Sequence, residues 1–321
     1  MIAAHALAGK HVVVTGAGGS IASELCRQIV AAGEYAHLTM IGLTESALYN
    51  LARKLGRVGR ARYVLGSVND RALMDDVLWK SNADVVIHAA AHKHVPICES
   101  NPCEAIRNNV GGTYTLALAA AAAGVEQFLL VSTDKAVRPA SVMGATKRVA
   151  ERIIRDFGTT RTRFLTVRFG NVLDSAGSVL PLWREQIATG GPVTITHPDC
   201  TRYFMSIPDA VQLILGTLAL DVDGGTYIFD MGEPKRIVEI ARELIGARDI
   251  PIRFTGLRQG EKLEEELHHG GELIPTAHPR IFRVHDAGVP ALACGDVPGL
   301  LALAQSGDRR RAQGRLMELA A

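Results

Sequence analysis

Apolar residues in the first half of the chain follow two alternating spacings. Short runs rich in Val, Ile and Leu, such as HVVVT and DVVIHAAA, are separated by longer stretches in which apolar residues recur at helical spacing. Unbroken apolar runs indicate strands buried on both faces, and helices between them indicate parallel strands. The pattern therefore predicts an α/β fold with a doubly wound parallel sheet. The other expected strands are HLTMI, RYVLG, QFLLVST and RFLTVRF, and the expected helices begin at about 19 and cover about 46–56, 70–79, 102–123 and 141–157.

After residue 170 this alternation breaks. The chain there consists of short pieces punctuated by Gly and Pro, among them GSVLP, GGPVTITHP and GEPKR, which is typical of loops and small excursions. We therefore expect a large Rossmann-type domain over 1–170 and a smaller, discontinuous lobe over 171–290, with about 205–235 returning to the large domain. The Ala- and Leu-rich tail over 291–321 is expected to be helical, with the basic run DRRRAQGR on a solvated face.

Composition excludes several classes of protein. Apolar residues make up 47% of the chain and charged residues 21%, with a formal net charge of +2, which favours small-molecule partners over nucleic acid. No run approaches the roughly 20 apolar residues of a membrane span, and the start lacks the pattern of a secretion signal. The five cysteines are odd in number and form no CxxC pair, so we expect free thiols. We expect a cytoplasmic protein without a nucleic-acid or membrane partner.

A glycine-rich turn, TGAGGSIASEL, follows the first expected strand and opens the first helix. Gly16 permits the tight turn, and Gly19 lets the backbone approach a pyrophosphate, which the free N–H groups and the helix dipole then bind. Ala22 stands at the third small position, where a methyl group is tolerated. A turn of this kind can also serve packing alone, but its place at the first strand predicts that 1–170 is a dinucleotide-binding domain.

The end of the second expected strand, MIGLTES, departs from the usual pattern. An acid there usually holds the adenosine ribose hydroxyls, and its absence leaves room for the 2′-phosphate of NADP. Gly42 stands at that position, Glu45 follows three residues later, and Ser67 lies where an Asp that contacts adenine is common. The sequence thus leaves both NAD and NADP open, with a lean toward NADP.

The run STDKAVRPASVMGATK, residues 132–147, contains the candidate chemistry. It follows an expected strand, so its first residues lie at the carboxyl edge of the sheet, where doubly wound folds bind ligands. Asp134 and Lys135 are adjacent there and can serve as an acid and a base; a plain ion pair is the alternative. Met143 stands four residues before Lys147, where a dehydrogenase is expected to have a tyrosine. A thioether cannot carry a proton.

Together these segments resemble the extended short-chain dehydrogenase/reductases, and within them the UDP-N-acetylglucosamine 4,6-dehydratases of capsule and glycan biosynthesis. Members of that family oxidise C4 of the hexose with bound nicotinamide, eliminate water across C5 and C6, and return the hydride to C6, which regenerates the cofactor. Many carry an added membrane-bound region, and this chain resembles their soluble catalytic part. The shared motifs are TGAGGSIASELCRQI, HAAAHKHVP, ESNPCEAIRNNVGGT, VSTDKAV, VMGATKR, RFGNVL, GSVLPL, GGPVTITHP, TRYFM and LRQGEKLEEEL.

The resemblance implies catalytic roles. Asp134 is the expected acid for the C6 hydroxyl and Lys135 the expected base at C5, which requires Lys135 to be partly neutral through burial or a nearby cation. Because Met143 replaces the tyrosine that usually accepts the O4 proton, that proton must reach Asp134 directly, through Thr133 or through water. Lys147 is expected to hold the nicotinamide ribose. A family branch with Met at this place keeps the C5 configuration, so we expect a non-inverted UDP-4-keto-6-deoxy sugar.

The resemblance also makes 171–290 a nucleotide-sugar-binding lobe. A UDP-sugar brings two negative phosphates, which favours arginines and backbone donors. We expect Arg202, Arg258 and Asn171 near the diphosphate, Glu261 near the uridine ribose and Lys93 beside the sugar. No metal is expected, because the carboxylates and imidazoles lack ligand spacing. The expected cofactor-binding residues are Gly16, Gly19, Ser20, Ile21, Thr44, Ser67, Val68, Ala89, Ala90 and Lys147.

Two positions depart from the family motifs: Asp174 stands where Gly usually follows RFGNVL, and Glu264 stands where an aromatic residue is usual. A C4 epimerase or a C5-inverting dehydratase is an alternative on the same fold, and a non-catalytic NADP-sensing protein is an alternative of another class. Fold analogy implies a homodimer or larger homo-oligomer paired through the helices at about 102–123 and 141–157.

Overall fold

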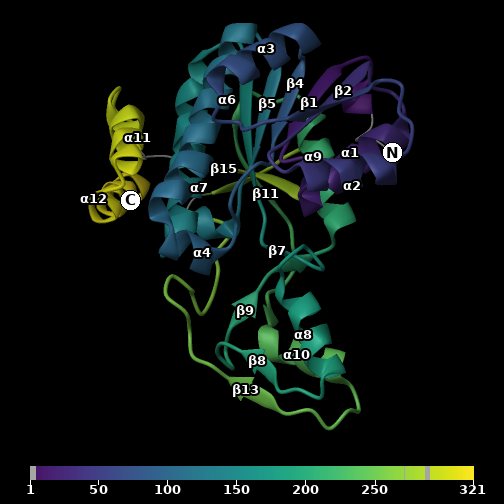
Figure 1. Cartoon of the computed structure of the whole chain (residues 1–321), viewed down its shortest axis with the longest axis vertical. Coiled ribbons are helices and arrows are strands. Elements are labelled where there is room, and N and C mark those ends of the chain that lie inside the picture. The colour runs from purple at the N-terminus through teal and green to yellow at the C-terminus, as the bar shows by residue number, and fades with distance from the viewer. Residues whose placement is uncertain (1–4, 271, 286–289) are drawn as a thin grey trace.

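A nine-stranded sheet forms the centre of the large body in the computed structural model, which describes residues 5–270, 272–285 and 290–321. Its order is β14-β15-β11-β6-β5-β4-β1-β2-β3 (Figure 1). The strands from β11 to β3 run parallel, and β15 joins β11 in antiparallel orientation. Their bounds are β1 His11–Thr15, β2 His37–Gly42, β3 Ala61–Leu65, β4 Val85–His88, β5 Gln127–Val131, β6 Arg163–Arg168, β11 Gly225–Phe229, β14 Leu273–Pro275 and β15 Ile281–Val284.

Helices cover both faces of this sheet because successive strand residues point to opposite sides. Val12 and Val14 of β1 pack in one apolar cluster with α1, α2 and α9, whereas Val13 packs in a second cluster with α3, α6 and the far end of α7. This confirms the predicted doubly wound sheet of Rossmann type. The helices are α1 Ser20–Ala32, α2 Glu45–Leu55, α3 Arg71–Ser81, α6 Gly112–Ala123, α7 Val142–Asp156 and α9 Ile207–Leu218.

The helix expected over 102–123 is not uniform. It consists of α5 (Pro102–Ala105), a π-helical turn (Ile106–Gly111) and then α6, and the short helix α4 (Val95–Ser100) precedes it. Single π-helical turns occur frequently at functional sites. Here the turn brings the Asn109 side chain onto the backbone of His92, which lies in the loop after β4.

The smaller lobe lies below the large body (Figure 1) and has its own apolar cluster. In it α8 (Val179–Ala188) and α10 (Ile237–Ile245) pack against the paired strands β8 (Val193–Ile195) and β13 (Ile252–Phe254). Two shorter pairs connect this lobe to the large body: β7 (Asn171–Val172) with β10 (Phe204–Met205), and β9 (Thr201–Arg202) with β12 (Lys235–Arg236).

The boundary of this lobe differs from the expected one at its C-terminal end. The segment that was expected to return to the large body does so over 207–229, which contains α9 and β11. The strands β14 and β15 within 273–284, which the sequence-based boundary assigned to the lobe, also belong to the large body. Short edge strands such as these are hard to predict from local sequence, because a parallel sheet can accept one further strand in either parallel or antiparallel orientation.

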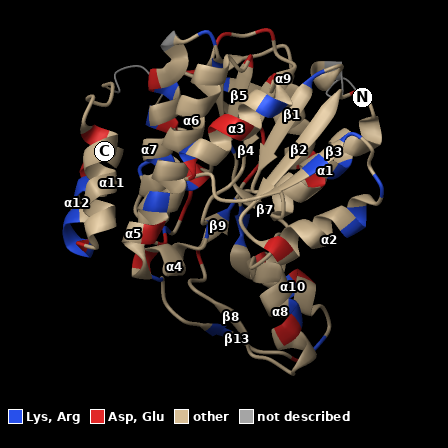
Figure 2. Ribbon diagram, turned by 45° about the horizontal axis from the view of Figure 1, so that its top comes forward, with Lys and Arg blue, Asp and Glu red and all other residues tan. Residues whose placement is uncertain are grey.

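The C-terminal tail forms two helices, α11 (Asp296–Ser306) and α12 (Arg309–Ala320), which lie along α7 (Figure 1). Leu300, Leu316 and Leu319 of this pair share an apolar cluster with Ile153 of α7 and Ile106 of the π-helical turn. The basic run of α12 faces outward (Figure 2). The chain's own tail therefore covers part of the surface of α7, one of the two helices that were expected to pair with a second copy.

Candidate active site

A cavity of about 880 Å³ lies at the carboxyl edge of the sheet, between the large body and the loop that follows β7. In doubly wound folds this edge is the binding crevice, at the point where strand order reverses on either side of β1. The cavity is large enough for a dinucleotide's reactive half together with a sugar. Predicted site residues that line it are Gly16, Gly19, Ser20, Ile21, Ala89, Lys93, Thr133, Lys135, Met143, Lys147 and Asn171.

The nucleotide end of the cavity is built on the glycine turn. Gly16 adopts a φ of 67°, and a Cβ there would lie 2.8 Å from the Cα of Ala90, so only glycine fits. Gly19 is the N-cap of α1 and provides no side-chain hydrogen bond to the helix start. No side chain caps the N-terminus of α1, so its backbone N–H groups can bind an anionic pyrophosphate. The close turn at Gly16 leaves room for that group.

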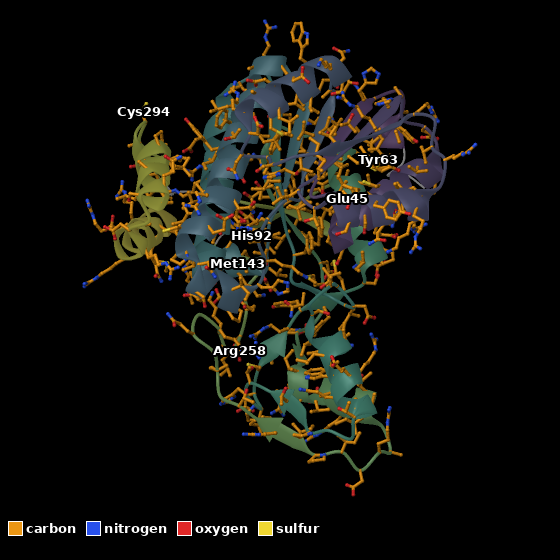
Figure 3. All side chains as sticks on the ribbon, viewed as in Figure 1. Glu45, Tyr63, His92, Met143, Arg258 and Cys294 are labelled. Carbon is orange, nitrogen blue, oxygen red and sulfur yellow. The ribbon has the colours of Figure 1, made fainter. Side chains whose placement is uncertain are left out.

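Four predicted cofactor contacts lie outside the cavity wall. Thr44 is exposed at the N-cap of α2, and Ser67 accepts a hydrogen bond from the N–H of Asn69 at 3.1 Å. Val68 is buried in the cluster beneath α6, and Ala90 lies under Gly16. Figure 3 shows Glu45 on the β2 side of the large body, well away from Met143. The residues predicted to contact adenosine thus lie apart from the candidate catalytic residues in the cavity.

Residues 132–136, the candidate catalytic segment, turn sharply after β5. Asp134–Ala136 form one 3-10 turn capped by Thr133, and the N–H of Asp134 donates to the carbonyl of Phe169 at 3.1 Å. The Asp134 side chain is fully buried, and it is Thr133 and Lys135 that line the cavity. The Thr133 hydroxyl donates to Asp134 Oδ1 at 2.8 Å. A bound molecule therefore meets the carboxylate through the hydroxyl of Thr133 and the amine of Lys135.

Gly170 makes room for this buried carboxylate. A Cβ at Gly170 would lie 3.2 Å from Asp134 Oδ2 and 2.9 Å from the Cβ of Tyr203. Among the residues that the structure describes, Asp134 Oδ2 has no hydrogen-bond partner. A buried carboxylate oxygen without a partner is energetically unfavourable and is a common mark of a functional site.

Three oxygens surround the Lys135 amine. Nζ lies 3.0 Å from Asp134 Oδ1, 3.2 Å from Asn171 Oδ1 and 3.4 Å from Glu265 Oε1. Burial lowers the pKa of Lys135, but the carboxylates of Asp134 and Glu265 outweigh burial, so the pKa is raised above its usual value. The expectation that burial makes Lys135 partly neutral is therefore wrong for this arrangement, because two carboxylates accompany the amine.

The loop bearing Glu265 is clamped under the catalytic segment. Arg202 donates to the carbonyls of Leu263 and Lys262 at 2.9 and 2.7 Å, and the Lys262 amine donates to the carbonyl of Val137 at 2.8 Å. Glu265 is 7% exposed and its Oε2 has no hydrogen-bond partner among the described residues. Burial raises the pKa of Glu265, and the charge of Lys135 opposes that rise only in part.

Lys147 and Met143 stand on the first turns of α7, and both line the cavity. The Lys147 amine donates to the carbonyl of Val131 at 2.7 Å, and burial lowers its pKa to about 8. Met143 is 4% exposed and packs in the apolar cluster shared with the C-terminal helices. The position that usually bears a phenol thus presents an apolar surface to the cavity.

A buried charge network supports the far side of this helix. Arg168 binds Glu151 through two hydrogen bonds of 2.7 and 2.6 Å, and Ser132 donates to the same carboxylate at 2.6 Å. Burial raises the pKa of Glu151, but Arg168 more than reverses this effect, so the pKa lies below its usual value. The network ties Ser132, directly after β5, to Glu151 of α7.

The expected substrate residues divide into two groups. Asn171 and Lys93 line the cavity, and the Lys93 amine lies 3.4 Å from the Ser175 hydroxyl. Arg202 is only 6% exposed and uses its guanidinium on backbone carbonyls, which favours a structural role over phosphate binding. Glu261 accepts from Thr196 at 2.8 Å and from the N–H of Arg258 at 3.1 Å. Arg258 is exposed on the segment between the two bodies (Figure 3).

The two residues that depart from the family motifs both fit their local surroundings. Asp174 adopts a φ of 57°, in the left-handed region where Gly is favoured and Asp is among the better tolerated alternatives. Its carboxylate pairs with Arg184 on α8. Glu264 is exposed, next to the buried Glu265.

Two residues that position the site were not singled out in the sequence. Asn109 accepts from the N–H of His92 at 2.8 Å and donates to the Thr146 hydroxyl at 2.9 Å, joining the loop after β4, the π-helical turn and α7. Glu265 contacts Lys135 across 130 positions of sequence. Both lie in motifs that carry the family resemblance, but no local pattern distinguishes them from their neighbours.

The described residues provide neither a membrane span nor a metal centre. None of their helices is long and apolar enough to cross a membrane. No group of three or more His, Cys, Asp or Glu residues within 5–270, 272–285 and 290–321 is arranged to hold a metal ion. The five cysteines are free, as predicted.

The fold and the cavity define the class of protein. A doubly wound sheet with a glycine turn after β1 is the framework of dinucleotide-binding proteins, and the extended short-chain dehydrogenase/reductases that the sequence resembles share this framework. Residues 12–286 match the family described as "Polysaccharide biosynthesis protein", and the chain belongs to that family.

Sequence relatives agree with this assignment. The chain is 47% identical over 299 residues to "Probable polysaccharide biosynthesis protein EpsC" of Bacillus subtilis, covering 88% of this chain and 50% of the relative. It is 45% identical over 289 residues to "Capsular polysaccharide biosynthesis protein CapD" of Staphylococcus aureus, covering 86% and 48%. The chain therefore spans about half the length of these two relatives.

A third relative bears a more specific name. The chain is 30% identical over 262 residues to a Campylobacter jejuni protein named "UDP-N-acetylglucosamine 4,6-dehydratase (inverting)", covering 80% of this chain and 77% of that protein. Among solved structures, Pen from Bacillus thuringiensis superposes with a TM-score of 0.79 at 27% identity, covering 94% of this chain and 98% of that one.

Proposed function

We propose that this protein is a nucleotide-sugar 4,6-dehydratase that converts UDP-N-acetylglucosamine to the UDP-4-keto-6-deoxy sugar. The observation that carries the proposal is the arrangement at the cavity floor, where Thr133 and Lys135 face the cavity and both contact the buried carboxylate of Asp134. An acid and a base fixed side by side suit removal of water from adjacent carbons. The similarity to the Campylobacter dehydratase supports the substrate class.

The described residues fit a nicotinamide dinucleotide. The glycine turn leaves a cradle that a Cβ at Gly16 would fill, and the uncapped start of α1 faces it. Lys147 lines the cavity and is the proposed partner of the nicotinamide ribose. When bound, the nicotinamide supplies reversible hydride chemistry, taking a hydride from C4 of the sugar and returning it to C6.

We propose that Thr133 and Asp134 together replace the missing phenol. The Thr133 hydroxyl can accept the O4 proton from the sugar while its own proton passes to Asp134 Oδ1, 2.8 Å away. The protonated carboxylic acid then returns a proton along the same path to the C6 oxygen, which leaves as water. One carboxylate thereby serves two successive proton transfers, and the apolar Met143 takes no part in either.

Lys135 is the proposed base at C5. A neutral amine removes the C5 proton, which the C4 ketone has made acidic, and returns a proton to C5 after the hydride reaches C6. Return to the same face from a fixed amine retains the C5 configuration, so we propose a non-inverted product. This differs from the outcome named for the Campylobacter relative.

We propose NAD rather than NADP as the cofactor, which revises the lean drawn from sequence. The 2′-phosphate of NADP needs a cation, and the segments 42–48 and 66–69 contain neither Lys nor Arg, whereas Glu45 stands in the first turn of α2. A carboxylate there suits ribose hydroxyls and repels a phosphate. We expect the dissociation constant for NAD to be at least tenfold below that for NADP; the reverse order would overturn this choice.

For the sugar, we propose Asn171 and Lys93 as contacts within the cavity and Arg258 as an exposed cation for the diphosphate. Glu261, which supports the turn at Arg258, is the proposed neighbour of the uridine ribose. Alanine at Arg258 should raise KM for the UDP-sugar without a comparable fall in kcat, because a phosphate contact acts equally in ground and transition states.

One assay tests the reaction. Purified protein is incubated with UDP-N-acetylglucosamine and NAD, and the product is analysed by mass spectrometry and by NMR of the C5 position. Loss of one water with retained C5 configuration is the expected result. An unchanged mass with altered C4 would indicate an epimerase, loss of water with inverted C5 would indicate an inverting dehydratase, and no reaction would indicate a dinucleotide-sensing protein.

A further inference from the structure

A second buried carboxylate lies against Lys135 and has no role in the proton transfers proposed for Thr133, Asp134 and Lys135. Glu265 comes from the loop between β13 and β14, and its Oε1 lies 3.4 Å from the Lys135 amine. Its side chain is 4% exposed, and Oε2 has no hydrogen-bond partner among the described residues. Burying a carboxylate with one unbonded oxygen costs free energy, so its presence calls for a compensating function.

The protonation state of Lys135 creates the need for such a group. An ammonium has three N–H donors, and in this structure three oxygens surround Nζ, from Asp134, Asn171 and Glu265. Lys135 is therefore held as a cation between two carboxylates. A cation cannot take a proton from C5, so Lys135 must release one before it can act as the base.

Asp134 is a poor recipient for this proton. Its Oδ1 already accepts from the Thr133 hydroxyl at 2.8 Å, and in the proposed reaction the same carboxylate must be free to receive the O4 proton. Glu265 has no such second duty. Burial raises the pKa of Glu265 toward that of a group that can hold a proton, with Lys135 opposing and Asp134 reinforcing this rise.

We propose that Glu265 is the proton partner of Lys135 and thereby converts it from an ammonium to the neutral amine that the C5 step requires. This inference rests on the proposed dehydration. One Lys135 N–H bond breaks and one Glu265 O–H bond forms, and nothing is oxidised or reduced. The pair remains neutral overall, and the electron pair of the broken N–H bond stays on Nζ as the amine lone pair. Rotation about the Cε–Nζ bond then turns this lone pair toward the cavity, and Glu265 returns its proton once the sugar has left.

The surroundings of Glu265 support a transfer within the pair. The charged groups that face it are Lys135 and Asp134 from the catalytic segment, Arg202 from β9 and Lys262 from its own loop. The charges of Arg202 and Lys262 also lower the pKa of Glu265, after the larger effects of burial, Lys135 and Asp134. Their hydrogen bonds go to the backbone carbonyls of 262–263 and Val137, so neither donates to Glu265. Glu265 does not line the cavity, which makes it a positioning residue that acts through Lys135.

The test compares Glu265→Gln with the matched control Glu264→Gln, an exposed carboxylate one position earlier. We expect Glu265→Gln to lower kcat about 100-fold with KM within threefold of wild type. Reduced nicotinamide should still form when the sugar is added and should accumulate, because C4 oxidation does not use Lys135. Exchange of the C5 proton with deuterated solvent should be lost, and the control should behave as wild type.

Two further comparisons separate a proton function from packing. Glu265→Asp retains a carboxylate, so it should be at least tenfold more active than Glu265→Gln, and its pH profile should keep the acidic limb that the Gln variant loses. Equal loss in both variants, or a Gln variant within threefold of wild-type kcat, would overturn the inference while leaving the dehydratase proposal standing. Failure of the wild type to release water would overturn both.

Discussion

Two lysines of the same cavity, twelve positions apart in the chain, are held in opposite electrostatic environments: Lys147 is buried and Lys135 is partly exposed. The Lys147 amine donates to the backbone carbonyl of Val131, and burial lowers its pKa to about 8. The Lys135 amine lies between the carboxylates of Asp134 and Glu265, and its pKa is raised although burial acts in the other direction. Burial alone therefore does not decide the charge of a lysine in this site.

The difference assigns the two amines different tasks. Near Lys147 the neighbouring carboxylate, Glu151, is bound by Arg168, so it does little to offset the loss of hydration. Near Lys135, no arginine of the described residues pairs with Asp134 in this way, and the carboxylates hold the proton on the amine. Lys147 is suited to hold a ribose by hydrogen bonds, whereas Lys135 is suited to exchange protons with the groups beside it.

The largest expected effect comes from removing one carboxylate from Lys135. Asp134→Asn should lower kcat for dehydration by about 10³-fold, because the acid for the C6 oxygen is lost. It should also move the pKa of Lys135 downward, toward the environment of Lys147. Product formation is measured by mass spectrometry at several pH values. Turnover close to that of wild type would show that Asp134 is not the acid.

The second effect concerns stability rather than rate. The pKa of Lys147 is about 8 in the folded protein, against 10.5 ordinarily. Between these pH values the unfolded chain binds more protons than the folded protein, so the free energy of unfolding should rise with pH from about 8 to 10.5. Below about pH 8 the folded protein carries the full cost of the buried ammonium. Relative to Lys147→Met, the free energy of unfolding of the wild type should increase by up to about 3 kcal/mol over this pH range.

Denaturant unfolding of wild type and Lys147→Met at matched pH values checks this sign. Groups common to both proteins cancel in the difference between them. A difference in the free energy of unfolding that stays flat from about pH 8 to 10.5 would show that Lys147 keeps an ordinary pKa, and the contrast with Lys135 would disappear.

The smallest expected effect isolates the hydroxyl between the cavity and Asp134. Thr133→Val keeps the shape of the side chain but removes the proton path, and it should lower kcat by about 30-fold, as expected when a positioned proton-transfer group is only partly replaced by water. Thr133→Ser is the matched control and should retain most activity. If the valine variant is as active as the serine variant, the O4 proton reaches Asp134 by another route.

Much of the fold depends on short-range patterns. The strand and helix alternation over 11–168 matches prediction because each element repeats its apolar spacing within a few residues. The turn at Gly16 was recognisable because its φ of 67° is a local backbone demand that favours glycine. Asp134 and Lys135 were recognisable because the residues directly after a parallel strand lie at the ligand-binding edge of the sheet.

The relations between distant segments were not readable in this way. The tail over 296–320 covers α7, and β14 and β15 extend the sheet, although neither pairing has a local signature. Thr133 rather than Asp134 reaches the cavity because the turn after β5 directs the carboxylate inward, against Gly170. Such outcomes depend on which surfaces meet once the chain is compact.

By itself the sequence determined the doubly wound sheet, the glycine cradle and the presence of an acid and an amine beside a methionine, since each depends on neighbours within a few positions. Only the tertiary structure decided the charge of that amine. Glu265 lies 130 positions from Lys135 in the chain but 3.4 Å from it in space. The reason is physical: a buried amine takes its protonation state from the charges around it, and these are assembled only by folding.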